Sequence, residues 1–182
     1  VRTDAGVLTI EPPAPRVVHV RFGPAGFAGN YNPAVIAPPE KIAFKIGEAA
    51  DAWTLSTADL RVRVARPGGD ITFQTADGKD ILREGGRDLA HGATQSFQTE
   101  TVLYGLGQHQ NGLLDYSGTI TRLQQANRDV AVPMLVSPKG FGILWNNAAV
   151  TDVESGLASG PAILIRSEAG GVDYHFMYGA EL

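Results

Sequence analysis

The sequence predicts an all-β domain, built as a two-sheet antiparallel sandwich. Short runs of alternating apolar and polar residues recur along the chain, as in half-buried strands. Turn-forming residues separate these runs, with 22 glycines and 11 prolines among 182 residues. No helical pattern of roughly 11 residues lies between the runs, so alternating strand–helix layers are disfavoured. We therefore expect about ten or more strands in one domain spanning residues 1–182.

The composition is that of an ordinary globular domain, with 43% hydrophobic and 19% charged residues. A formal net charge of −4 disfavours nucleic acid as a partner. No apolar run reaches the roughly 18 residues of a membrane span. The chain has no cysteine, which excludes disulfides, thiolate zinc sites and a cysteine nucleophile. Because it begins at Val1, we expect a processed chain or a fragment. The compartment stays open, with a periplasmic or extracellular location favoured over the cytoplasm.

The first hundred residues alternate between strand-like runs and turns. Leu60–Ala65 and Ile71–Thr75 form the clearest predicted hairpin, joined by Pro67–Asp70. Residues 24–40 contain four prolines and predict a long loop with a functional or packing role. A polar edge strand is expected at Ser96–Thr101. The remaining strands expected in this part are Val7–Ile10, Arg16–Phe22, Ile42–Ile46, Trp53–Ser56 and Ile81–Leu82.

Residues 103–131 are rich in Gly, Gln and Asn and show little apolar periodicity. They predict a long functional loop with at most one helical turn. Strong strand patterns resume after it, in two further hairpins. Their expected strands are Val132–Val136 with Phe141–Asn146, and Ala162–Arg166 with Val172–Met177.

The motif Gly105-Leu106-Gly107 begins like a dinucleotide-binding fingerprint. Its third glycine is missing and no helix pattern follows, so the helix N-terminus that would hold a phosphate is absent. We interpret it as a tight glycine turn leaving a strand. No two of the four histidines have metal-like spacing with a carboxylate, and no metal or cofactor is expected. His19 and His175 lie in strand patterns and are interpreted as structural, whereas His109 lies in the special loop.

No nucleophile elbow of the Gly-x-Ser-x-Gly type occurs, so a catalytic serine is disfavoured. Asp129 is the carboxylate of most interest, since it follows Asn127 and Arg128 in the polar loop just before a strong strand. A surface ion pair or a loop cap is the commoner role for such a residue. Glycoside hydrolysis needs two carboxyl groups flanking one bond, and no such pair stands out. We therefore assign no catalytic residue to this chain.

Four segments follow one another in a specific order: Tyr104–Gln110 (YGLGQHQ), Asn127–Asp129 (NRD), Val132–Asn147 (VPMLVSPKGFGILWNN) and Val172–Gly179 (VDYHFMYG). Together they resemble glycoside hydrolase family 31, and specifically its amino-terminal domain. The details are most similar to α-xylosidase-like members of this α-glucosidase and α-xylosidase family. The resemblance is strong over about residues 100–180 and looser, but compatible, before them.

This resemblance implies a galactose-mutarotase-like supersandwich that precedes a catalytic (β/α)₈ barrel. It implies retaining hydrolysis of an α-xylosidic or α-glucosidic bond by the parent enzyme, with the catalytic carboxylates in the barrel. The barrel and an α-linked oligosaccharide are then the expected partners. A loop from this domain would line the sugar pocket, with Asp129 on the substrate and Gln108, His109, Asn127 and Arg128 beside it. A carboxylate suits this role because it accepts hydrogen bonds from two hydroxyls.

The sequence departs from the α-glucosidase pattern at two points. Val130–Pro133 replaces a Thr-x-Pro run, and Gln108 stands where the family often has Glu. Two other hypotheses stay open: a stand-alone carbohydrate-binding sandwich, and an aldose-epimerase-type enzyme that would use a histidine with a carboxylate.

Overall fold

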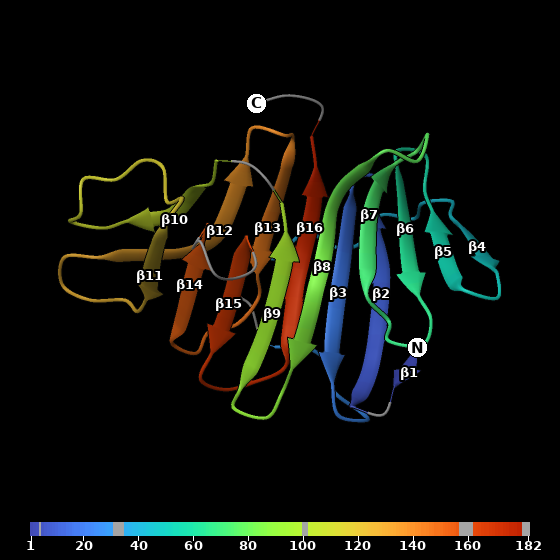
Figure 1. Ribbon diagram of the computed structural model, residues 1–182, viewed down its shortest axis with the longest axis horizontal. Coiled ribbons are helices and arrows are strands. Elements are labelled where there is room, and N and C mark those ends of the chain that lie inside the picture. Colours follow the sequence, from blue (N-terminus) through green and yellow to red (C-terminus); the bar gives the residue numbers. More distant parts are fainter. Residues whose placement is uncertain (4, 31–34, 100–101, 157–161, 180–182) are drawn as a thin grey trace.

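The computed structural model describes residues 1–182 except 4, 31–34, 100–101, 157–161 and 180–182. Its described residues form two antiparallel sheets packed face to face, with no helix among them (Figure 1). The predicted all-β sandwich is therefore confirmed. Within the described ranges, no helix has the length and apolar character that a membrane crossing needs.

One sheet has seven strands and the other has nine. Across the seven-stranded sheet the order is β1 (Arg2–Thr3), β2 (Gly6–Ala14), β3 (Val17–Gly23), β16 (Val172–Tyr178), β13 (Phe141–Trp145), β12 (Val130–Ser137) and β10 (Tyr104–Gln108). Across the nine-stranded sheet it is β11 (Thr119–Leu123), β14 (Thr151–Ser155), β15 (Ile163–Ser167), β9 (Ala93–Gln98), β8 (Asp80–Asp88), β7 (Ile71–Thr75), β6 (Leu60–Ala65), β5 (Ala52–Ser56) and β4 (Lys45–Glu48).

The core fills the space between the two sheets, and it follows directly from the alternation in the strands. Successive side chains of a strand point to opposite faces, so every second residue of β6 and β3 is buried. Aromatic rings form its centre: Phe73 stacks on Phe176 with ring centroids 4.0 Å apart, and Phe97 meets Tyr174 edge-on at 5.3 Å. Trp145 is 2% exposed, as its strand pattern predicts.

A buried polar network crosses the core and joins the two sheets. The Tyr174 hydroxyl on β16 donates a hydrogen bond of 2.6 Å to Glu84 Oε1 on β8. Glu84 Oε2 accepts the Ile71 N–H at 2.8 Å and is also paired with Arg87. Burial raises the pKa of Glu84 above its ordinary value of 4.5, an effect that Arg87 and the hydroxyl of Tyr174 oppose. The network satisfies a carboxylate that would be strongly unfavourable alone in the core.

Most of the expected strands are observed, with shifted ends. Two of the three predicted hairpins pair in register, Val62 with Phe73 and Met134 with Leu144. The third hairpin prediction is wrong, because β15 (Ile163–Ser167) and β16 (Val172–Tyr178) do not pair and lie in different sheets. The strand expected at Ile42–Ile46 is Lys45–Glu48, and Ala162–Arg166 becomes Ile163–Ser167. β14 (Thr151–Ser155), which is rich in polar residues, was not expected at all. Residues 24–30 and 35–44 contain no strand, as predicted for the loop at 24–40.

Two further predictions about strands are wrong. The polar strand at Ser96–Thr101 is β9 (Ala93–Gln98), which lies in the middle of its sheet between β15 and β8; its end at residues 100–101 falls outside the described residues. Its polar side chains alternate because one face looks to solvent, which a central strand of a sandwich also does. Residues 103–131 are not one loop, because they contain β10 and β11, the edge strands at the same end of the two sheets (Figure 1).

Candidate functional site

The Gly105-Leu106-Gly107 motif lies within β10 rather than in a turn leaving it. Its register against β12 shifts between Gly105 and Gly107, which marks a β-bulge. A Cβ on Gly105 would lie 2.2 Å from Met134 O, and one on Gly107 would lie 1.8 Å from Val130 O. Leu106 between them has a φ of 61° and is buried. The glycines are therefore needed for close contact between two strands, and they form no phosphate cradle.

The bulge brings His109 and Asp129 together. The Nε2–H of His109 donates to Leu106 O at 2.9 Å, which leaves Nδ1 facing Asp129 Oδ1 at 3.7 Å. Tyr116 meets the imidazole edge-on, with centroids 6.2 Å apart. The His109 side chain is 9% exposed and that of Asp129 is 39% exposed. The carboxylate is thus held beside a nearly buried ring and still reaches solvent.

The other three predicted site residues lie around this pair. Ala126 and Asp129 form an isolated bridge, so Asn127 and Arg128 occupy the exposed tip of a tight turn. Gln108 is exposed at the end of β10, opposite Val130. The structure therefore brings all five predicted residues to one end of the sandwich, where β10 ends and β12 begins, but it pairs only His109 with Asp129 in direct contact.

A hollow of about 360 Å³ lies at the β11–β12 connection, and its lining does not include Asp129. It is lined by Leu123, Gln124, Gln125, Ala131, Pro133 and residues 147–151. Asp129 therefore lies on the protein surface and outside this hollow.

The outer face of the seven-stranded sheet is apolar over β12, β13 and β16. Side chains that point away from the core there include Val132, which is 41% exposed, and Met134, Leu144 and Met177, which are partly buried. Met134 lies directly opposite Leu144, and Met177 opposite Gly142, so they form a continuous surface. An outer sheet face of this kind usually packs against another body.

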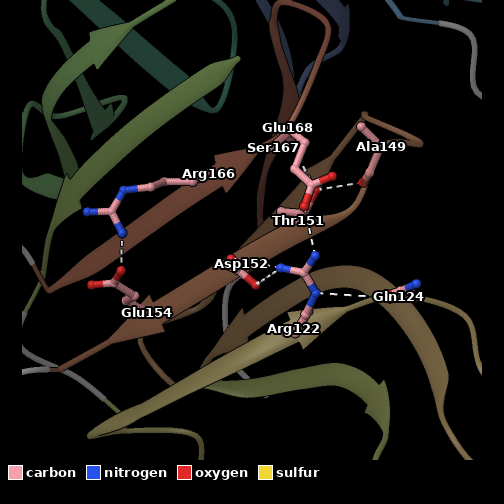
Figure 2. A network of polar contacts seen from close by, with 9 residues as sticks. All are labelled: Arg122, Gln124, Ala149, Thr151, Asp152, Glu154, Arg166, Ser167 and Glu168. Atoms are coloured by element: carbon pink, nitrogen blue, oxygen red, sulfur yellow. Dashed lines mark hydrogen bonds and ion pairs between the residues drawn. The ribbon is translucent and has the colours of Figure 1, made fainter. Parts of the chain in front are cut away.

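The outer face of the nine-stranded sheet is charged by contrast. Arg122 on β11 lies between Asp152, at 3.2 Å, and Glu168, at 2.7 Å (Figure 2). Arg166 on β15 pairs with Glu154 on β14 (Figure 2). The hydrogen bond that Arg122 donates to Glu168 and the charge of Asp152 raise the pKa of Arg122. These exposed groups satisfy one another across three strands, which is the pattern of a solvated face rather than of a binding site.

A second polar cluster lies on the outer face of β3 and β16. Asp173 is fully buried; its Oδ1 accepts a hydrogen bond from His19 Nε2 at 2.7 Å, and its Oδ2 accepts the Asn30 N–H at 2.7 Å. The rings of His19 and His175 are stacked, with centroids 4.0 Å apart. Burial and the neighbouring His19 lower the pKa of His175 to about 4, so its ring is neutral at pH 7.

A groove of about 420 Å³ opens over this cluster. Its walls come from β2, β3, β16 and the loop at 24–40; the lining residues are Pro13, Ala14, Val17, His19, Asn30, Val35, Ala37, Pro38, Pro39, Glu40, Asn146 and His175. The sequence alone does not predict this cluster, because His19 and His175 lie far apart in the chain. The one local pattern that points to it is Asp173-x-His175, which places both side chains on one face of a strand.

The geometry can be compared with known proteins. A family model described as "Glycosyl hydrolase 31 N-terminal galactose mutarotase-like domain" matches residues 7–154. An α-xylosidase of Saccharolobus solfataricus is 32% identical over 170 residues, which cover 81% of this chain and 23% of that protein. The crystal structure of a GH31 α-xylosidase from Xanthomonas citri aligns with a TM-score of 0.74 and 29% identity, over 83% of this chain and 18% of that one.

A GH31 α-xylosidase from a soil metagenome, complexed with xylose, aligns with a TM-score of 0.84 over 99% of this chain and 31% of that one. At 22% identity this match shows the fold alone. The two packed antiparallel sheets and these matches define a galactose-mutarotase-like β-sandwich domain of glycoside hydrolases. The chain belongs to glycosyl hydrolase family 31, as its N-terminal domain. It spans less than a quarter of the length of the S. solfataricus relative.

Proposed function

We propose that this domain packs against the catalytic (β/α)₈ barrel of a family 31 α-glycosidase and contributes Asp129 to the rim of its sugar pocket. The parent enzyme would hydrolyse α-xylosidic or α-glucosidic bonds, and the similarity to α-xylosidases favours the first. The domain itself would supply no catalytic carboxylate.

The observation that carries the proposal is the contrast between the two outer faces. One is covered by ion pairs among Arg122, Asp152 and Glu168, while the other exposes Val132 among apolar neighbours. Further exposed apolar side chains lie on β12 and in the 109–118 segment, at the end that carries Asp129: Leu113, Leu114 and Val130. An apolar surface next to a positioned carboxylate suits a contact with a larger body that also holds a polar ligand.

The chemistry of Asp129 fits sugar recognition. Its carboxylate reaches solvent, and the nearest His109 nitrogen, Nδ1, lies 3.7 Å from Oδ1, beyond hydrogen-bond distance. Its acceptor positions therefore remain available to two adjacent hydroxyls of a pyranose, and charge-assisted hydrogen bonds of this type are the stronger ones.

The test is Asp129→Asn in the full-length parent, assayed on aryl α-xyloside and α-glucoside. Loss of hydrogen bonds to a charged group is worth about 1.5–3 kcal/mol, so kcat/KM should fall about ten- to hundredfold. The matched control is Asp77→Asn on the β7–β8 turn, which should leave kcat/KM unchanged. An unchanged kcat/KM for Asp129→Asn removes this residue from the pocket.

The 182-residue chain alone should not hydrolyse either substrate, and turnover by it would contradict a non-catalytic role. Titration calorimetry with xylosyl and glucosyl oligosaccharides separates the proposal from a stand-alone binding module. Measurable affinity of the chain without a barrel would favour the binding module.

A further inference from the structure

Three side chains with metal-binding chemistry lie together on the outer face of the seven-stranded sheet. They are His19 on β3 with Asp173 and His175 on β16, and one ligand atom from each lies within 4.8 Å of the others. We propose that these residues bind a divalent transition-metal ion of the zinc class. This site is separate from the β10–β12 end that carries Asp129, so the proposal does not depend on the sugar pocket.

The backbone places the three side chains on one face. Asp173 and His175 are two residues apart on one strand and therefore point the same way. His19 lies directly opposite His175 on the neighbouring strand, and Cβ atoms of such pairs are about 4.5–5.5 Å apart. The strand register alone thus brings three ligand side chains together on one face without help from a flexible loop.

The ligand types select the ion. Two imidazoles with one carboxylate suit zinc and its neighbours among the divalent transition metals, whereas magnesium and calcium prefer oxygen ligands only. Water from the groove can supply a fourth ligand, and Asn146 lines the same groove.

Two buried atoms favour this interpretation over a purely structural cluster. Within the described part of the chain, His175 Nδ1 and Asn146 Oδ1 are buried and have no hydrogen-bond partner. Asp173 has a structural role in any case, because it holds His19 and the Asn30 N–H and so ties the 24–30 segment to the sheet. That role explains neither unpartnered atom, and buried polar groups in native proteins rarely lack a partner.

Ion binding requires one local movement. The His19 and His175 rings are nearly parallel, with an interplanar angle of 10°, and the lone pairs of two parallel rings cannot meet at one ion. One ring must therefore turn about its Cβ–Cγ bond. The side chain of His19 is 20% exposed and borders the groove, so it has room to turn, and its hydrogen bond to Asp173 would be replaced by coordination.

Titration calorimetry of the 182-residue chain with Zn²⁺ at pH 7, in a buffer that does not bind metal, tests the proposal. We expect saturable binding of one ion per chain, at a site with three protein ligands. His19→Gln should weaken binding at least tenfold, because it removes a partly exposed ligand. The matched control is His91→Gln on the exposed β8–β9 turn, which should not change the affinity. Equal Kd values for wild type and His19→Gln, or no binding by wild type, would overturn the proposal.

A second measurement does not depend on any variant. Long-range ¹H–¹⁵N spectra resolve the ring nitrogens of all four histidines. On addition of Zn²⁺, signals of His19 and His175 should shift while those of His91 and His109 stay unchanged. A saturating ion should also raise the Tm, by about 7 °C at 100 times Kd for a chain of this length. Shifts confined to His91 or His109, or no shift, would place zinc elsewhere or nowhere.

Discussion

The hydroxyl of Tyr174 provides a sharp test of the buried network that joins the two sheets. Tyr174→Phe removes one oxygen and leaves the ring and its aromatic contacts in place. Glu84 Oε1 then loses the hydrogen bond of 2.6 Å that it accepts from this hydroxyl. Glu84 and Tyr174 are both buried, so bulk water cannot replace the donor. The variant therefore leaves a carboxylate oxygen unsatisfied in the core.

The expected loss follows from the charge of the acceptor. A hydrogen bond to a charged group contributes about 1.5–3 kcal/mol to the free energy of unfolding. Unfolding entropy is about 2.1 cal/mol/K per residue, or about 0.38 kcal/mol/K for 182 residues. Tyr174→Phe should therefore lower the Tm by about 4–8 °C.

Thermal and urea unfolding followed by circular dichroism measure this change. Tyr178→Phe is the matched control: it lies on the same strand and is partly exposed, and the expected change in unfolding free energy is within about 0.5 kcal/mol. If the Tm of Tyr174→Phe lies within about 1 °C of wild type, the reasoning about the network is wrong.

The loss of stability caused by Tyr174→Phe should also depend on pH, and the direction of this dependence can be predicted. Burial raises the pKa of Glu84 above 4.5, and the hydrogen bond from Tyr174 opposes that rise. Removing the hydroxyl raises the folded-state pKa further, while the unfolded-state pKa is unchanged. A carboxyl with a raised folded-state pKa destabilises the fold when it is ionised, and this effect fades as pH falls. The destabilisation by Tyr174→Phe should thus shrink as the pH falls through the raised folded-state pKa of Glu84 in the variant towards its lower folded-state pKa in the wild type.

Two further predictions concern the bulge and the apolar face. Gly107→Ala places a Cβ 1.8 Å from Val130 O and should destabilise the chain by more than about 2 kcal/mol in urea unfolding; Gly112→Ala, also at positive φ but with open space, should cost about 1 kcal/mol. Val132→Asp should lower the Tm of the full-length parent but leave that of the 182-residue chain within about 1 °C, because only the parent would bury this side chain; equal losses in both would argue against a domain contact there.

How far the sequence predicts the fold is seen best in individual strands. Leu60–Ala65 alternates cleanly, so both the strand and its hairpin partner followed from the pattern. β10 and β11 were missed because Gly, Gln and Asn have low β-propensity and their pairing depends on partners distant in the chain. β9 was expected at an edge, yet it is central, since a strand with one solvated face has the same alternation in either place.

The residues of the candidate site were likewise predictable only in part. The resemblance singled out Gln108, His109 and the Asn127–Asp129 turn, and the structure brings them to one end of the sandwich. The role of the glycines in β10 could not be derived from the sequence alone, because glycine occurs both in tight turns and at close strand–strand contacts, for different reasons.

The sequence by itself determined the class of the fold and the family, since period-two alternation, turn residues and ordered motifs are all local. Only the tertiary structure decided which distant residues meet. The register between β3 and β16 sets His19 beside Asp173 and His175, and the packing of the two sheets sets Tyr174 against Glu84. Both contacts join residues far apart in the chain, and their geometry depends on the shared core rather than on any local pattern.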